Sequence, residues 1–145
     1  TITNSTVADN QAVTGNGGVI LTSNASTITV RNSILWGNQA ATGGHFAFCK
    51  YGTLTMSNIV MNNDGDGNFG NGPYVAGTGL TTTVNGYQSE NDPFFVNATG
   101  RDYHLTISSD AIDHADSTYA PAKDIAGTPR PQGPASDIGA YEFVK

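Results

Sequence analysis

The feature that most constrains this chain is a short phrase that recurs four times within its first 91 residues. In each copy an asparagine is followed, six residues later, by a second asparagine or by an aspartate. The copies are Asn4 to Asn10, Asn32 to Asn38, Asn58 to Asp64 and Asn85 to Asn91. The leading asparagines are 28, 26 and 27 residues apart. A fixed period of this size indicates that each repeat is one structural unit, which buries its apolar side by stacking on its neighbours.

Two architectures have a period near this length, the leucine-rich repeat and the parallel β-helix. A leucine-rich repeat needs a leucine framework and helix-forming residues, and this chain lacks both. Apolar and polar residues alternate before each leading asparagine, with Ile28 and Val30 in one column that Leu54 and Met56 continue. We therefore expect an all-β fold, a parallel β-helix of about four coils over residues 1–91.

The leading asparagine of each repeat is expected at a bend between two strands. Such a bend favours a residue that tolerates the left-handed backbone region, and asparagine does so better than other residues except glycine. Identical amides stacked about 4.8 Å apart also donate and accept hydrogen bonds along the stack. We expect Asn4, Asn32, Asn58 and Asn85 to form a structural ladder of this kind rather than a ligand site.

The composition favours a polar β protein with many turns. Apolar residues make up 37% of the chain and charged residues 12%, below the roughly 45–50% and 25% of typical globular domains. The six lysines and arginines are scattered through a chain of net charge −6, which argues against nucleic acids and anionic membranes as partners. No apolar run is long enough to span a bilayer. Cys49 is the only cysteine, so no internal disulfide forms.

The sequence from Asn91 onward breaks the repeat and carries other motifs. The main ones are Asn91-Asp92-Pro93-Phe94-Phe95-Val96, Arg101-Asp102-Tyr103-His104-Leu105, Asp124-Ile125-Ala126-Gly127-Thr128-Pro129-Arg130 and Asp137-Ile138-Gly139-Ala140-Tyr141-Glu142. In order and spacing this region resembles the choice-of-anchor Q region that ends many secreted bacterial right-handed β-helix proteins. The preceding residues resemble the pectate-lyase-like repeats of such proteins. The resemblance implies a right-handed β-helix in an extracellular or cell-surface protein, and it implies no enzymatic activity.

Residues 92–145 are expected to cap the repeats. A stack of parallel strands ends in a row of unpaired backbone groups, so solenoids end in atypical units that cover them. The prolines of this region suit segments that cannot extend a ladder. We expect the cap to pack on the last coil, and Arg130 to pair with Asp124 or Asp137 and so fix a loop in place.

The other end of the repeats carries no such cap, because Thr1-Ile2-Thr3 already lies inside a repeat. We expect either upstream coils or another molecule on this edge. The addition of a strand to an open sheet edge is a common mode of association, and a head-to-tail contact that does not close gives a filament. Thr1, Ile2 and Thr3 are therefore the predicted assembly edge.

Asp64, Asp66 and Asn68 place three oxygen-bearing side chains at alternate positions, as at the start of a calcium loop. The EF-hand pattern is incomplete, because Phe69 stands where it needs glycine and Val75 where it needs glutamate. Two interpretations stay open: a partial Ca²⁺ site completed by a neighbouring coil, and a turn built from glycine, aspartate and asparagine. No other cofactor is expected.

Enzymes of this architecture that degrade polysaccharides need residues that the repeats lack. A lyase needs a base beside an acidic cluster, and Arg31 is the only basic residue on an expected repeat strand. A glycosidase needs two opposed carboxylates roughly 5–9 Å apart, whereas the acidic residues of the repeats fall at turns. We expect a non-catalytic extracellular structural protein, a surface filament or adhesin-stalk segment that self-associates through open β-helix ends. The alternative is the C-terminal part of a carbohydrate-binding or polysaccharide-degrading β-helix protein.

Overall fold

The structure is a computed structural model that describes residues 1–62, 75–77 and 79–145. The described part is all-β, with one 3₁₀ turn, η1 (Ala98–Gly100), and no α-helix. Its strands are β1 (Ile2–Thr3), β2 (Thr6–Ala8), β3 (Gln11–Ala12), β4 (Ile20–Trp36), β5 (Gln39–Ala40), β6 (Ala47–Met61), β7 (Val75–Ala76), β8 (Gly79–Ser89), β9 (Phe95–Asn97) and β10 (Asp102–Leu105).

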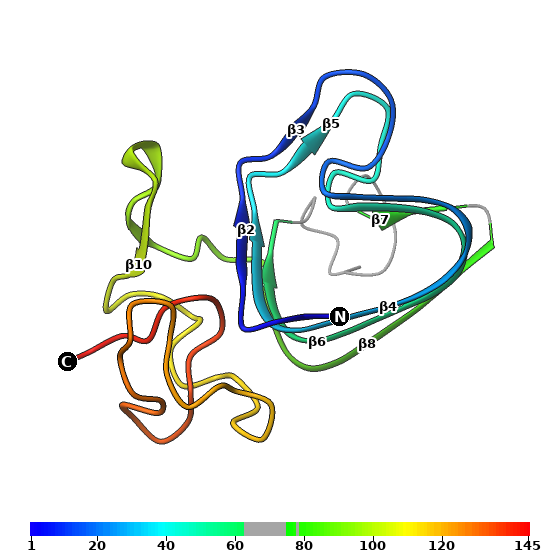
Figure 1. Cartoon of the computed structure of the whole chain (residues 1–145). Helices are drawn as coiled ribbons and strands as arrows, with labels where there is room; N and C mark the ends of the chain where they lie inside the picture. Colours follow the sequence, from blue (N-terminus) through cyan, green and yellow to red (C-terminus); the bar gives the residue numbers. More distant parts are fainter. Residues whose placement is uncertain (63–74, 78) are drawn as a thin grey trace.

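Successive repeats lie beside one another in parallel register (Figure 1). We number them 1 to 4 from their first residues, Thr1, Ile28, Leu54 and Thr81. β1 and β2 pair with β4, β4 pairs with β6, and β6 pairs with β7 and β8. The register aligns Ile2 with Val30, Val30 with Met56, and Met56 with Val84. The expected all-β class with parallel strands is therefore confirmed, and the period of the sequence is the period of the strand pairing.

The main hydrophobic core lies inside the curved sheet. Side chains alternate between the two faces of a strand, and the inward residues of the expected column, Val30, Leu54 and Met56, are 0% exposed. Leu35 and Phe46 belong to the same cluster. Burial of this apolar surface is the principal stabilising contribution to such a sheet, at about 25 cal/mol per Å².

A second hydrophobic cluster lies on the outer face of the same strands. Ile34 of β4 and Val60 of β6 are 0% exposed and belong to it. Its other buried members come from the C-terminal region and are Leu105, Ala111, Ala115 and Ile138. Strands that are buried on both faces have continuous apolar sequences, which accounts for Ile34-Leu35-Trp36 and Ile59-Val60-Met61.

The C-terminal region lies along the flank of the repeats rather than on the face of the last one, so the expected packing on the last coil is wrong. Figure 1 shows the segment after β10, yellow to red, beside the bend that joins β1 to β2. It contacts repeat 4 where Ser89 Oγ donates to Asp110 Oδ2 (3.0 Å), and repeat 1 where Asn4 Nδ2 donates to the Asp137 carbonyl (3.3 Å). The physical reason is the outward apolar surface of β4 and β6, which this region removes from water.

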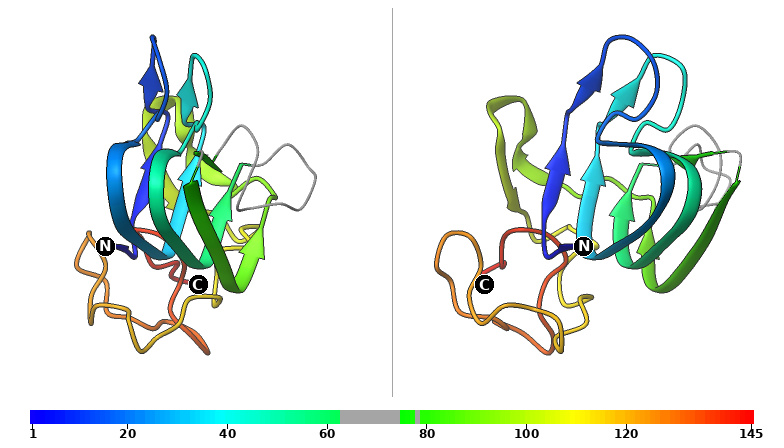
Figure 2. Two further views of the ribbon diagram at one scale, coloured as in Figure 1. Left: turned by 90° about the vertical axis from the view of Figure 1, so that its right-hand side faces the viewer. Right: turned by 45° about the vertical axis from the view of Figure 1, so that its right-hand side comes forward.

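A short antiparallel hairpin, β9 with β10, stands beside β2 (Figure 2, right). Tyr103 in β10 donates its hydroxyl hydrogen to Asp9 Oδ2 over 2.9 Å. Phe95 packs edge-on against Tyr103, with 5.1 Å between ring centroids. These contacts hold the hairpin against repeat 1.

Candidate functional site

Three asparagines form a column at the bend between the sheet faces, which we call the corner column. Asn4, Asn32 and Asn58 have φ angles of 44°, 49° and 54°, the left-handed region expected at this bend. Asn32 Nδ2 donates to Asn4 Oδ1 over 3.1 Å, in a buried hydrogen bond between repeats. The corner residue therefore fixes the backbone bend and links adjacent repeats through its amide.

Each member of the corner column also binds the C-terminal region. The donations run from Asn58 Nδ2 to the His114 carbonyl (2.8 Å), from Asn32 Nδ2 to the Asp116 carbonyl (2.9 Å) and from Asn4 Nδ2 to the Asp137 carbonyl (3.3 Å). Asn32 Oδ1 also accepts from the Asp116 N–H over 2.9 Å. The column thus attaches the C-terminal region to three successive repeats, one amide at a time.

The fourth predicted ladder residue, Asn85, lies one position off the column. Asn85 is exposed and pairs with Ser57 rather than with Asn58. Gly86, with φ 68°, lies against Asn58 instead, and a Cβ at Gly86 would lie 2.5 Å from Asn58 Oδ1. The prediction for Asn85 is wrong because repeat 4 turns on a glycine, which adopts the left-handed region without a steric penalty.

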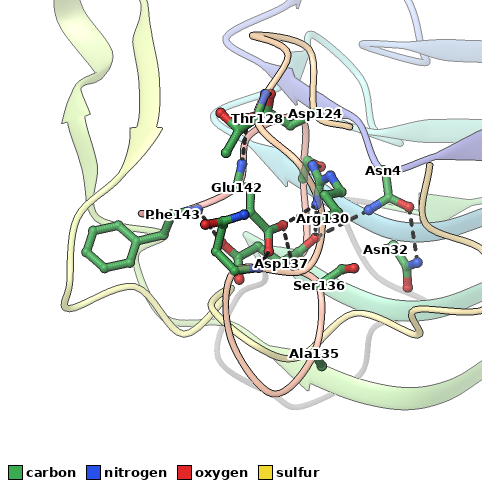
Figure 3. A network of polar contacts seen from close by, with 12 residues as sticks. Asn4, Asn32, Asp124, Thr128, Arg130, Ala135, Ser136, Asp137, Glu142 and Phe143 are labelled. Atoms are coloured by element: carbon green, nitrogen blue, oxygen red, sulfur yellow. Dashed lines mark hydrogen bonds and ion pairs between the residues drawn. The ribbon is translucent and has the colours of Figure 1, made fainter. Parts of the chain in front are cut away.

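Arg130 holds the C-terminal region together from its interior (Figure 3). Its side chain is 1% exposed, and Nη1 lies 3.0 Å from Oε2 of the fully buried Glu142. Arg130 also donates to the carbonyls of Asp137 and Gly139, over 2.7 and 2.8 Å. The expected pairing with the carboxylate of Asp124 or Asp137 is therefore wrong: the carboxylate partner is Glu142. The two aspartates instead accept hydrogen bonds from backbone N–H groups.

Those two aspartates tie separate loops together and ionise differently. Burial raises the pKa of Asp137 to about 6, and the negative charges of Glu142 and Asp113 act in the same direction. At Asp124 burial also disfavours the charge, but three backbone hydrogen bonds outweigh it and lower the pKa. Their donors are the N–H groups of Glu142, Thr128 and Ala126. Both aspartates therefore serve the internal structure of this region.

The predicted assembly edge consists of β1, β2 and β3, and among the described strands each of them pairs on one side only. Thr1 is exposed, and Ile2 and Thr3 form β1. Ile2 packs against the main core, so the apolar column of the repeats extends to this edge. The structure thus places Thr1, Ile2 and Thr3 on an open edge of the sheet.

The backbone of β2 shows which groups face outward. Asp9 N donates to a β4 carbonyl over 3.0 Å, and the Val7 carbonyl accepts from Asn38 Nδ2 over 2.8 Å. Because backbone groups point alternately to the two sides of a strand, the N–H groups of Thr6 and Ala8 point away from β4. They are available to the carbonyls of an incoming parallel strand.

A hollow of about 380 Å³ lies beside this edge, and we call it the edge hollow. It is lined by Asn4, Ser5 and Thr6 of repeat 1 and by Pro121, Lys123, Asp124, Ile125, Arg130 and Ala140 of the C-terminal region. Arg130 Nε is buried and has no hydrogen-bond partner. Lys123 is exposed. The hollow therefore offers hydrogen-bond donors and positive charge to an oxygen-bearing group.

Another hollow, of about 330 Å³, lies beside β3 and β5. Its polar lining consists of amides and one imidazole, from Gln11, Asn38, Gln39, Asn62 and His45. His45 Nδ1 accepts from the Ala40 N–H over 2.7 Å, which orients the ring. Such groups both donate and accept hydrogen bonds, as recognition of sugar hydroxyls requires.

Two kinds of site were searched for in the described ranges. No group of three or more His, Cys, Asp or Glu side chains in residues 1–62, 75–77 and 79–145 could hold a metal ion. The predicted calcium residues Asp64, Asp66 and Asn68 lie outside the described residues. No helix in the described part of the chain is long and apolar enough to cross a membrane.

Comparison of this chain with protein-family models, with curated proteins and with solved structures gave no match. The argument about function therefore depends on the geometry of the corner column, the open edge and the edge hollow.

Two residues of this region were missed by the sequence reasoning. Glu142 ends the Asp-Ile-Gly-Ala-Tyr-Glu motif, and an acidic residue that closes an otherwise apolar motif is a signal that could have identified it as a partner of Arg130. Asp116 binds Asn32 through its backbone. Because every residue except proline carries those groups, the sequence offers no signal for this contact.

Proposed function

We propose that this chain is a right-handed parallel β-helix that serves as a non-catalytic extracellular structural protein and associates with further strands through its open edges. The β-helix is supported by the parallel register of Ile2, Val30, Met56 and Val84 across four repeats. It is also supported by the apolar column inside them. A stack of this kind can be lengthened without changing its cross-section, which suits a surface filament or an adhesin stalk.

The observation that carries the proposal is the open edge of β1, β2 and β3. Outward N–H groups at Thr6 and Ala8 and the exposed end of the apolar column offer both backbone pairing and burial to a new strand. β8 likewise pairs only with β6 among the described strands. The β8 edge of one copy can therefore continue the β1 and β2 edge of another, and repetition of that contact gives a filament.

The non-catalytic assignment is supported by the state of the buried acids. Glu142 is paired with Arg130, and Asp124 and Asp137 accept hydrogen bonds from the backbone. These acids therefore already have structural partners inside the protein. The extracellular assignment rests on the resemblance of residues 91–142 to the choice-of-anchor Q region.

The proposal is tested by blocking the edge without disturbing the sheet. Ala8→Pro removes an outward N–H, and proline is tolerated on edge strands in that orientation. We expect the wild-type chain to show a sedimentation coefficient that rises with concentration, and Ala8→Pro to remain monomeric with a similar melting temperature. Val7→Pro is the matched control, because it removes an N–H that faces β4 and should destabilise the fold. A wild-type chain that stays monomeric at all concentrations would contradict self-association.

The amide-lined hollow beside β3 and β5 favours a second candidate function, the binding of carbohydrate. Gln11 and Gln39 are stacked in register across β3 and β5, so their amides form a repeating polar surface. We expect neutral oligosaccharides to bind there, and Gln39→Ala to weaken binding at least tenfold in calorimetric titrations. If Gln39→Ala binds as well as the wild type, the hollow is not a carbohydrate site.

A further inference from the structure

The edge hollow lies where the corner column would continue. The C-terminal region gives one partner to each repeat along the column: the His114 carbonyl to repeat 3, Asp116 to repeat 2 and the Asp137 carbonyl to repeat 1. In the left view of Figure 2 its orange part reaches as far along the stack as the blue strands of repeat 1. There it lines the edge hollow together with Asn4.

Two donors in this hollow have a hydrogen to spare. Arg130 Nε is buried without an acceptor, in a side chain that is 1% exposed. Asn4 Oδ1 already accepts from Asn32, and Asn4 Nδ2 donates one hydrogen to the Asp137 carbonyl. An amide nitrogen carries two hydrogens, so Asn4 can donate the second one onward, in the direction that Asn32 sets.

We propose that the edge hollow is a socket for the corner side chain of a further strand that pairs with β1 and β2, and that this side chain is an asparagine. The inference rests on the proposed function and names the partner: a parallel strand with the repeat pattern of this chain. Asparagine fits because it adopts the left-handed bend and presents an oxygen to the N–H groups of Asn4 and Arg130. Glycine can make the same bend but presents no acceptor.

The charges around the socket are consistent with an oxygen acceptor. Lys123 adds a positive charge to the lining. Asp124 also lines the hollow, but its Oδ1 accepts from Ala126 and Thr128 and its Oδ2 accepts from Glu142, so both oxygens are engaged with the backbone. The remaining lining groups of repeat 1 are the hydroxyl-bearing Ser5 and Thr6. An incoming oxygen therefore meets donors rather than an unsatisfied carboxylate.

The test uses a synthetic strand as the probe and the full chain as the receptor. The probe is a peptide with the sequence of residues 1–12, Thr1 to Ala12, and its matched control carries Asn4→Gly, which keeps the bend and removes the amide. We expect the unaltered peptide to bind the chain at least ten times more tightly than the control. We also expect it to shift the NMR resonance of the Arg130 Nε–H, which strand pairing alone would leave in place.

The outcomes separate the socket from the proposed function. If both peptides bind equally well and the Arg130 resonance stays in place, the socket is wrong while edge pairing stands. If neither peptide binds, the socket is wrong, and sedimentation of the chain alone decides whether self-association survives. The Ala8→Pro chain should bind neither peptide, and tight binding by that variant would also overturn the inference.

Discussion

The corner asparagines combine a backbone role with a side-chain role. Asn32 is 0% exposed, has φ 49°, and makes three hydrogen bonds through its amide, one to Asn4 and two to Asp116. Asn85 was predicted from the same spacing but is exposed and lies off the column. The sequence alone could not separate them, because Asn85 and Gly86 are both residues that can make the bend.

This difference predicts unequal effects of substitution. Asn32→Ala should lower the free energy of unfolding by about 3–5 kcal/mol, because it removes three hydrogen bonds of about 1 kcal/mol each and strains a left-handed residue. Asn32→Gly should lose less, since glycine removes the strain. Asn85→Ala is the control and should stay within about 0.5 kcal/mol. Urea unfolding followed by circular dichroism measures all three, and equal losses for Asn32→Ala and Asn85→Ala would contradict the assignment.

The buried pair of Arg130 and Glu142 predicts a second large effect. Glu142 accepts only: from Arg130, from the Asp137 N–H and from the Gln132 N–H. Glu142→Gln keeps the shape but places an NH₂ group against a donor and leaves the arginine charge unpaired, so we expect a loss of about 3–5 kcal/mol. The exposed pair of Asp102 with His104 is the control, and Asp102→Asn should cost less than about 1 kcal/mol. Similar losses in the two variants would argue against a buried charge pair.

Asp137 predicts the pH dependence of stability. Its pKa is raised from 3.8 to about 6 by burial in the folded chain, so the folded state binds the proton more tightly than the unfolded state. The stabilisation is fully present below 3.8 and is lost as the pH rises to about 6. Carbon-13 NMR of the Asp137 carboxyl group should give a midpoint near 6. A midpoint at or below the ordinary value would contradict the effect of burial. Asp124 acts oppositely: its pKa is lowered, so its contribution is lost only at more acidic pH.

At the scale of elements, alternation predicted the inner face of β4 and β6 but not what covers the outer face. Val30, Leu54 and Met56 lie in the core as expected from their spacing. The C-terminal region was expected on the last repeat, yet the apolar residue Ile34, adjacent to inward-facing Leu35, already required cover on the other face. The run of apolar residues contained that information. The identity of the covering segment depends on contacts far apart in sequence, which no local pattern reveals.

The two faces of β4 predict distinguishable variants. Ile34→Ala and Leu35→Ala should each cost about 2–5 kcal/mol, because both side chains are almost fully buried. Only Ile34→Ala removes contact with the C-terminal region, so hydrogen exchange should become faster in residues 105–143 of that variant at conditions where the repeats stay folded. Leu35→Ala should instead raise exchange in the repeats. Identical exchange patterns would contradict the separation of the two clusters.

For the whole molecule, the period of the sequence predicted how the strands align, and it failed only at repeat 4. The asparagine spacings of 28 and 26 residues equal the register from Ile2 to Val30 and from Val30 to Met56. The third register step is 28, from Met56 to Val84, whereas the asparagine spacing is 27. An irregularity in the pairing between Ser57 and Ile59 accommodates the difference. A spacing argument detects a repeat but cannot locate an extra residue within it.

The net charge of the chain makes a prediction about its assembly. Each copy carries −6 at pH 7, so two copies repel one another while strand pairing and apolar burial draw their edges together. Raising the salt concentration shortens the Debye length from about 30 Å at 0.01 M to about 3 Å at 1 M. Salt should therefore strengthen self-association, and the concentration at which half of the chains are associated should fall. Sedimentation equilibrium at several salt concentrations measures this midpoint, with Ala8→Pro as the non-associating control. Association that weakens with salt would indicate that ion pairs between copies, rather than the strand edge, hold the assembly together.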